Sequence, residues 1–189
     1  MTDTPQLSDT PFRGGRAEPT MPDGKGHRLR SAGSTVVPVR RQRLWEIIMD
    51  EQRLAAAIPG AETLHRVDDA EVRTYAADVG IGVGMIKGTW RVTARFAEAI
   101  EPAHIVLFGG ADGPLGTSFG EGWIDFEPVE GGTRVSYSYA ILITGMVAKV
   151  SGRLIDAAAD KLIDKFYARL AQAVREERRA AADPQSAGE

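Results

Sequence analysis

Histidine and serine are the side chains best suited to acid–base, metal or nucleophilic chemistry, so their spacing is the first test of function. The chain of 189 residues has three histidines, His27, His65 and His104, and they are too far apart for an H-x-x-x-H or H-E-x-x-H motif. We expect no serine on a Gly-x-Ser-x-Gly nucleophile turn, although a Ser–His–acid triad assembles in space and is not excluded by chain order. A catalytic role would require His104, Tyr137 or Arg153 to converge inside one pocket. The sequence therefore predicts neither a catalytic residue nor a metal site.

Two glycine-rich stretches have the composition of ligand-binding loops. Gly80–Gly88 departs from the Gly-x-Gly-x-x-Gly spacing, because Met85 and Lys87 occupy the positions that the third glycine would need. A strand pattern follows it, whereas a bound phosphate would require a helix N-terminus. We therefore predict a hairpin bend with close backbone approach. Phe108–Thr117 is too glycine-rich for a strand, which leaves a mobile loop at a pocket mouth and a plain surface hairpin as alternatives.

Arg153 is the charged residue most suited to contact a ligand. It lies beside Leu154 and Ile155, so its guanidinium could donate to a ligand oxygen at a pocket rim, and an ion pair with Asp156 is the alternative. Two acidic pairs are interpreted as solvated surface: Asp68–Asp69 and Glu176–Glu177.

Composition excludes several classes of protein. The absence of cysteine excludes disulfide scaffolds, zinc–cysteine sites, iron–sulfur clusters and thiol nucleophiles. A formal net charge of -3 provides no basic footprint for nucleic acid. No stretch approaches the roughly 18–20 consecutive apolar residues of a membrane span, and the first residues have no apolar signal region. We therefore expect a cytoplasmic protein.

The composition divides the chain into a leader, one domain and a tail. Residues 1–33 are rich in proline and glycine and are predicted to be a disordered leader. Residues 34–178 are predicted to form the folded domain, and residues 179–189 a disordered polar tail. Pro38 favours an edge position for a first strand over 34–39. Two short helices follow, and Pro59-Gly60 ends the second.

Alternating polar and apolar residues then predict a run of strands. Met85–Phe96 has the clearest period of two, with Trp90, Val92 and Phe96 on one face. Further strands are predicted over these ranges: 63–67, 71–81, 104–108, 119–127 and 134–143. From Gly145 the period becomes helical for about thirty residues.

An antiparallel sheet with one polar face must bury its other face, and the C-terminal helix is the only element long enough to cover it. The sequence thus predicts an α+β helix-grip fold, in which a curved antiparallel sheet wraps a long C-terminal helix. Aromatic residues facing a helix that carries alanines leave unfilled volume, which favours a hydrophobic ligand pocket, with plain core packing as the alternative. The predicted ligand-binding residues are Tyr75, Trp90, Val92, Phe108, Ile124, Tyr137, Leu154, Ala158 and Leu162, with Arg153 as a polar contact.

Three ordered blocks carry a family resemblance over about residues 35–172. Leu54–Leu64 resembles the Ile-Pro-Gly-Cys-Glu-x-Leu segment of the carbon monoxide dehydrogenase G-subunit family, in the START/Bet v 1-like (SRPBCC) superfamily, with Ala61 in place of the cysteine. Ile86–Val92 is similar to its Phe-Lys-Gly-Lys-Val strand. Val150–Asp156 is similar to its Gly-Ser-Arg-Leu-Ile helix, with the first two residues reversed.

The resemblance implies an accessory protein for molybdenum hydroxylases of the carbon monoxide dehydrogenase type. In that family the proposed roles are carrying an isoprenoid quinone and recruiting the enzyme to the membrane. It implies a bound quinone or lipid in place of a covalent cofactor, and at most peripheral contact with the inner face of the cell membrane. Two alternatives stay open: a scaffold or maturation protein for that complex, and an enzyme of the cyclase/aromatase type.

Overall fold

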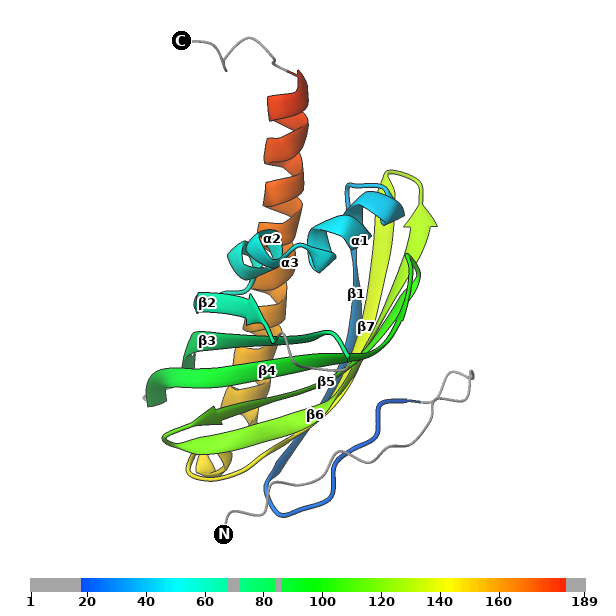
Figure 1. The fold of residues 1–189 in the computed structure, drawn as a ribbon. Helices are drawn as coiled ribbons and strands as arrows, with labels where there is room; N and C mark the ends of the chain where they lie inside the picture. The colour runs from blue at the N-terminus through cyan, green and yellow to red at the C-terminus, as the bar shows by residue number, and fades with distance from the viewer. Residues whose placement is uncertain (1–17, 68–71, 84–85, 183–189) are drawn as a thin grey trace, which may run out of the picture.

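A seven-stranded antiparallel sheet and one long helix make up the fold of the computed structural model, which describes residues 18–67, 72–83 and 86–182 (Figure 1). The elements in chain order are β1 (His27–Val37), α1 (Arg41–Met49), α2 (Glu51–Ala57), β2 (Ala61–Arg66), β3 (Thr74–Val83), β4 (Ile86–Ile100), β5 (His104–Gly113), β6 (Gly116–Val129), β7 (Gly132–Ile143), a 3-10 turn (Val147–Lys149) and α3 (Gly152–Ala182). The predicted α+β helix-grip arrangement is confirmed.

The sheet order is β1-β7-β6-β5-β4-β3-β2, so every strand from β2 to β7 pairs with its neighbour in sequence. Short connections between consecutive strands make this meander the simplest way to build an antiparallel sheet. β1 instead pairs with β7 and forms one edge of the sheet. Pro38 follows β1 directly, and its edge position agrees with the prediction.

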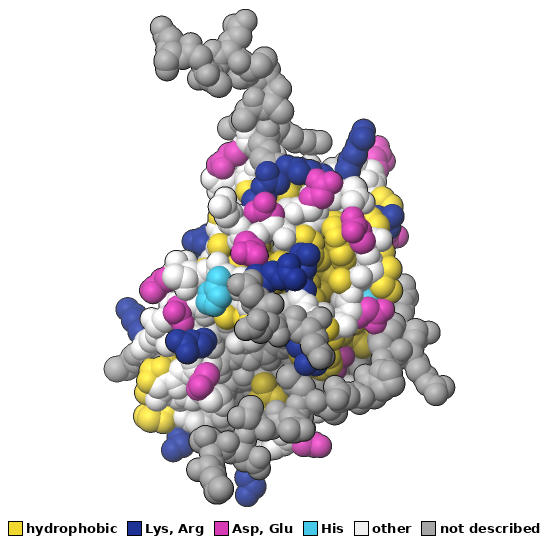
Figure 2. Space-filling model, viewed as in Figure 1, with side chains coloured by type: hydrophobic (Ala, Val, Ile, Leu, Met, Phe, Trp, Pro, Cys, Tyr) yellow, Lys and Arg dark blue, Asp and Glu magenta, His cyan; other side chains and the backbone are white. Residues whose placement is uncertain are grey.

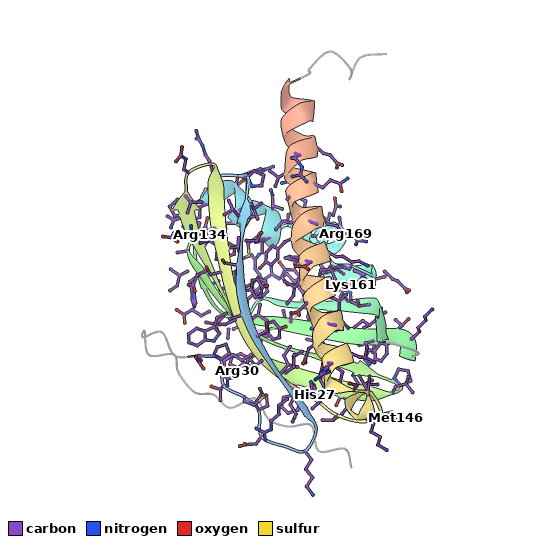
Figure 3. The ribbon with its side chains drawn as sticks, turned by 180° about the vertical axis from the view of Figure 1, so that it is seen from behind. His27, Arg30, Arg134, Met146, Lys161 and Arg169 are labelled. Carbon is purple, nitrogen blue, oxygen red and sulfur yellow. The ribbon has the colours of Figure 1, made fainter. Side chains whose placement is uncertain are left out.

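α3 crosses the concave face of the sheet. Its backbone approaches β1 near one edge of the sheet, and β3 and α2 near the other (Figures 1 and 3). Its C-terminal half contributes Leu170 and Val174 to the main core, where both are almost fully buried. The helix therefore bridges the sheet.

α1 and α2 close one end of the space between the sheet and α3. Leu44 and Ile47 are fully buried, and Trp45 packs edge-on against Phe126 of β6 with ring centroids 5.9 Å apart. Asp50 separates the two helices, and its carboxylate accepts a hydrogen bond of 3.0 Å from the Arg53 backbone N–H, as an N-cap does.

The first strand begins earlier than predicted. β1 starts at His27, inside the segment assigned to the leader, because its first half pairs residue by residue with β7 and buries Leu29. Residues 18–26 lie against the outer face of the sheet: Pro19 is buried, and the Thr20 N–H donates to Glu121 at 3.0 Å. The remainder of the predicted leader (1–17) and residues 183–189 of the tail lie outside the described residues.

Phe108–Thr117 is a hairpin, and the mobile-loop alternative is wrong. β5 continues to Gly113 and β6 starts at Gly116, with Gly109 opposite Gly120. Backbone pairing needs no side chain, so glycine content misled the strand assignment. The last helix also differs, since it starts at Gly152 rather than Gly145.

Candidate ligand-binding cavity

An apolar cavity of about 180 Å³ lies between the concave face of the sheet, the two short helices and the middle of α3. Its walls are aliphatic or aromatic and come from α1, α2, β2 to β7 and α3. They are Ile48, Leu54, Ile58, Leu64, Tyr75, Ala76, Ala77, Val79, Val92, Ala94, Phe96, Ile105, Leu107, Ile124, Val135, Phe166 and Tyr167.

Strand alternation and small residues explain why this space stays open. On β4, Val92, Ala94 and Phe96 point inward, while Thr93 between them is exposed on the outer face. Ala94 is paired with Tyr75, whose ring packs against Phe96 at 5.5 Å. Alanines in the middle of the concave face leave volume that the side chains of α3 do not fill.

The described residues that line the cavity include no acid, no histidine and no cation. Its only polar side-chain groups are the hydroxyls of Tyr75 and Tyr167. The Tyr75 hydroxyl lies 3.4 Å from the Met49 carbonyl oxygen and 3.3 Å from Nη1 of Arg73, which donates to it. Burial raises the pKa of Tyr167, and the nearby Tyr137 makes a smaller contribution in the same direction. The Tyr167 hydroxyl therefore stays neutral. The cavity is therefore suited to an uncharged, hydrophobic guest.

The structure places three of the predicted ligand-binding residues, Tyr75, Val92 and Ile124, on the cavity wall. Trp90 shares their inward face but lies beyond the cavity, where its indole N–H donates to the Gly116 carbonyl at 3.2 Å. Phe108 is on the outer face, because Leu107 points inward and neighbouring strand residues alternate. There the Arg95 guanidinium lies 5.9 Å from the Phe108 ring.

The predicted residues on α3 do not line the cavity. Leu154 is 51% exposed, and the half-buried Ala158 and Leu162 are absent from the cavity wall. The buried stripe of α3 runs through Ile155, and Leu154, the preceding residue, is turned about 100° away from it around the helix axis.

Arg153, predicted to contact a ligand at the pocket rim, is exposed and is not among the residues that line the cavity. The alternative contact of Arg153 with Asp156 is also not formed: the Asp156 carboxylate lies 3.2 Å from Nε2 of His27 instead. This contact joins the start of β1 to the first turns of α3 (Figure 3).

The residues that a catalytic role would require do not converge. His104 lies on the outer face with Nδ1 2.6 Å from the Asp125 carboxylate. Tyr137 lies in a separate groove, and Arg153 is exposed. The described residues contain no group of three metal-ligating side chains.

One serine has the Gly-x-Ser-x-Gly spacing, although it does not lie on a turn. Ser118 stands between Gly116 and Gly120, but all five residues belong to strand β6. A nucleophile turn joins a strand to a helix and exposes the serine at a sharp bend, which this regular strand does not.

Sequence reasoning missed most of the cavity wall. Ile48 and Leu54 come from the short helices and Ile58 directly follows the second, and no sequence signal places those helices over the cavity. Phe166 lies at i+4 from Leu162 on the predicted apolar face of the last helix, so helical periodicity could have identified it.

A second concavity, which we call the β1–α3 groove, lies at the edge of the sheet and measures about 370 Å³. It is lined by Ser34, Thr35, Val36, Val37, Tyr137, Asp164, Tyr167, Ala168, Ala171 and Arg175. Partial burial raises the pKa of Tyr137, and the carboxylates of Asp164 and Asp160 add to this. Tyr167 lines both the cavity and the groove.

Surface charge and helix hydropathy complete the description. On the face seen in Figure 2, acidic and basic side chains are interspersed around apolar patches, with no field of a single sign. Within the described ranges, no helix is both long enough and apolar enough to span a bilayer.

Comparison with known proteins identifies solved structures with a similar fold. A conserved protein from Geobacillus kaustophilus is 26% identical, with a TM-score of 0.72 over 78% of this chain and 96% of that one. The Zhui aromatase/cyclase from Streptomyces sp. R1128 is 13% identical, with a TM-score of 0.63 over 82% of this chain and 98% of its own. The latter likeness shows a shared fold alone. No curated protein sequence matches the chain.

The family model for the G subunit of carbon monoxide dehydrogenase (CoxG) matches residues 33–175, in agreement with the resemblance carried by the three sequence blocks. That match covers most of the chain and the whole sheet-and-helix unit apart from the first half of β1 and the last seven residues of α3. The chain therefore belongs to the CoxG family, named for the G subunit of carbon monoxide dehydrogenase.

Proposed function

We propose that this protein is a non-catalytic carrier of a hydrophobic ligand, an isoprenoid quinone or a lipid, that serves a molybdenum hydroxylase of the carbon monoxide dehydrogenase type. The cavity beneath α3, with its aliphatic and aromatic walls and no charged lining residue, is the observation that carries the proposal. Family membership supports the choice of partner.

Cavity size limits which part of a ligand enters. A volume of about 180 Å³ slightly exceeds the roughly 150 Å³ of an engineered apolar cavity that binds benzene. It would therefore take one ring system, such as a quinone head group, while a longer tail must lie elsewhere.

The inner face of the sheet offers a route for such a tail. Beyond the cavity, β5 and β6 carry Gly109, Gly120 and Gly122 on their inward side instead of large side chains. On α3, Ala158 and Ala159 are also small. We propose that an isoprenoid tail would follow these small residues between the sheet and α3.

Contact with a membrane is a second proposed role, favoured by the segment that follows β7. Met146 is 59% exposed and Leu154 is 51% exposed, and the exposed cations Lys149 and Arg153 lie near them in sequence. Apolar side chains flanked by cations are suited to an anionic membrane surface. Such a peripheral site at the inner face of the cell membrane would let the carrier load a membrane-soluble ligand.

Extraction of the full-length protein tests the carrier proposal. The protein, purified without detergent from a quinone-producing bacterium, is extracted with organic solvent, and the extract is analysed by mass spectrometry. We expect a stoichiometric quinone or lipid, and a rise in melting temperature when a menaquinone is added to stripped protein. Recovery of no small molecule, together with no stabilisation by quinones or lipids, would overturn the proposal.

A further inference from the structure

We infer that the β1–α3 groove binds an extended peptide of a partner protein, which adds to the free edge of β1 as an eighth strand. The inference concerns a protein-binding site and is independent of what occupies the apolar cavity.

The edge of β1 is accessible in the groove. β1 is the terminal strand of the sheet, so alternate backbone N–H and C=O groups point away from β7. Four consecutive residues, Ser34 to Val37, line the groove. Consecutive strand residues point to opposite faces, so a groove lined by all four must run along the strand's edge.

The two halves of β1 differ in whether they carry charged side chains that protect an edge strand from pairing with another chain. Arg28 and Arg30 are exposed on the first half, and charged side chains on an edge strand discourage pairing with another chain. The second half, Ser34–Val37, has no charge, and Val36 is 50% exposed. Within the described part of the chain, no other strand pairs with this edge. The second half is thus the part of the edge that favours pairing.

The helical wall of the groove has small residues in its middle and a charged residue at each end. Asp164, Ala168, Ala171 and Arg175 recur at intervals of three or four residues and so share one face of α3. The small side chains of the two alanines project little into the middle of the groove. Neither Asp164 nor Arg175 forms an ion pair with another described residue.

The charges define the sequence that the groove would accept. Asp164 and Arg175 are about 16 Å apart along the helix axis at 1.5 Å per residue. In an extended peptide, two residues four positions apart point to the same face and lie about 13 Å apart, and their long charged side chains cover the remaining distance. β1 and α3 both start at the end where His27 meets Asp156 (Figure 3), so Arg175 lies toward Val37 and Asp164 toward Ser34. A peptide antiparallel to β1 would therefore present an acidic residue first and a basic residue four positions later, with an apolar residue between them.

Exchange of β1 between two copies of this chain does not fit this description. It would place β1 of the partner copy in the groove, and residues 27–41 contain arginines but no acidic residue to face Arg175. The occupant that we propose is a segment of another protein.

Fluorescence anisotropy with labelled nine-residue peptides tests the inference on the full-length protein. One peptide has Glu and then Lys four residues later with valine between them, and its control has the two charges exchanged. We expect the first to bind about fivefold more tightly, as reversing two exposed ion pairs implies. The double variant Asp164→Lys, Arg175→Glu should exchange this preference. N-methylation of alternate peptide nitrogens should abolish binding, because strand addition needs those donors.

Two tryptophan variants locate the binding site. Ala168→Trp fills the groove and should weaken binding at least about tenfold, whereas Ala157→Trp, at an exposed position on the same helix outside the groove, should leave it unchanged. Equal binding of both peptides, no binding at millimolar concentration, or binding unaffected by Ala168→Trp would overturn the inference. A dimer in sedimentation that Ala168→Trp dissociates would also overturn it, because a second copy would then occupy the groove.

Discussion

The ring of Tyr137 on β7 stacks on the ring of Tyr167 on α3, with centroids 5.6 Å apart and an interplanar angle of 23°. Tyr167 lines both the apolar cavity and the β1–α3 groove, so this pair separates the two. Gly33 of β1 makes the arrangement possible, because a Cβ at that position would lie 2.4 Å from the Tyr137 hydroxyl. A strand residue without a side chain thus leaves room for the aromatic wall.

The buried hydroxyl of Tyr167 should make stability depend on pH in the alkaline range. Burial raises the pKa of Tyr167 above its ordinary value of 10.0. The folded protein then keeps a proton that the unfolded chain releases, so stability is intact below about pH 10 and declines as the pH rises further. The expected slope for one protected tyrosine is about 1.4 kcal/mol per pH unit.

Tyr167→Phe should remove this slope, so the variant should lose less stability than the wild type between about pH 9 and pH 11. Urea unfolding at both pH values measures the difference. Tyr137→Phe serves as the comparison and should have a smaller effect, because Tyr137 is less buried. Parallel pH profiles for wild type and Tyr167→Phe would contradict the prediction.

Filling the cavity should abolish ligand uptake without unfolding the protein. Ala94→Phe adds a ring to the cavity wall, whereas Thr93→Phe adds the same ring to the exposed outer face of the same strand. Overpacking should cost about 1–3 kcal/mol in Ala94→Phe. In mass spectrometry of solvent extracts, the ligand should be absent from Ala94→Phe and present in Thr93→Phe. Retention by both variants would show that the ligand binds elsewhere.

The exposed apolar residues after β7 should govern membrane contact. The double variant Met146→Ser, Leu154→Ser should reduce co-sedimentation with anionic phosphatidylglycerol vesicles about tenfold, because it removes apolar area that the membrane would bury. Ile100 is 50% exposed on a distant strand, so Ile100→Ser provides a matched control with no expected change. An equal loss in both would indicate nonspecific adsorption.

The Ile-Pro-Gly segment of the family motif should matter for stability through Gly60. Gly60 has φ of +81°, and a Cβ there would lie 2.4 Å from the Gly80 carbonyl oxygen. The Gly80 N–H also donates to the Gly60 carbonyl at 2.8 Å, so the two backbones are in direct contact.

Gly60→Ala should therefore destabilise the fold by more than the roughly 1–2 kcal/mol of a left-handed backbone alone. Gly131→Ala isolates that backbone cost, because Gly131 has φ of +84° but no atom within 4 Å of the added Cβ. Chemical denaturation of both variants gives the difference. If the two substitutions cost the same, the close approach to Gly80 contributes nothing.

Most of the strands and the long helix could be predicted because their signals are local. A period of two identifies β4 from Trp90 to Phe96, and Pro38 indicates that β1 is an edge strand. Neither signal depends on residues elsewhere in the chain. Three sequence blocks sufficed to assign the family. Where the signal was weak, as in the glycine-rich end of β5, pairing with β6 decided the structure.

The cavity wall was decided by tertiary structure. Alternation shows which residues share a face of a strand, but not which face lies under the helix, and Phe108 consequently proved to point outward. Helical periodicity identifies an apolar stripe, but the rotation of the helix about its axis relative to the sheet is set by packing, so Leu154 is exposed and Phe166 reaches the cavity. The sequence by itself determined the element types, their order and the family. Only packing between distant segments, whose contacts leave no local pattern, placed the cavity, its tyrosine wall and the groove beside β1.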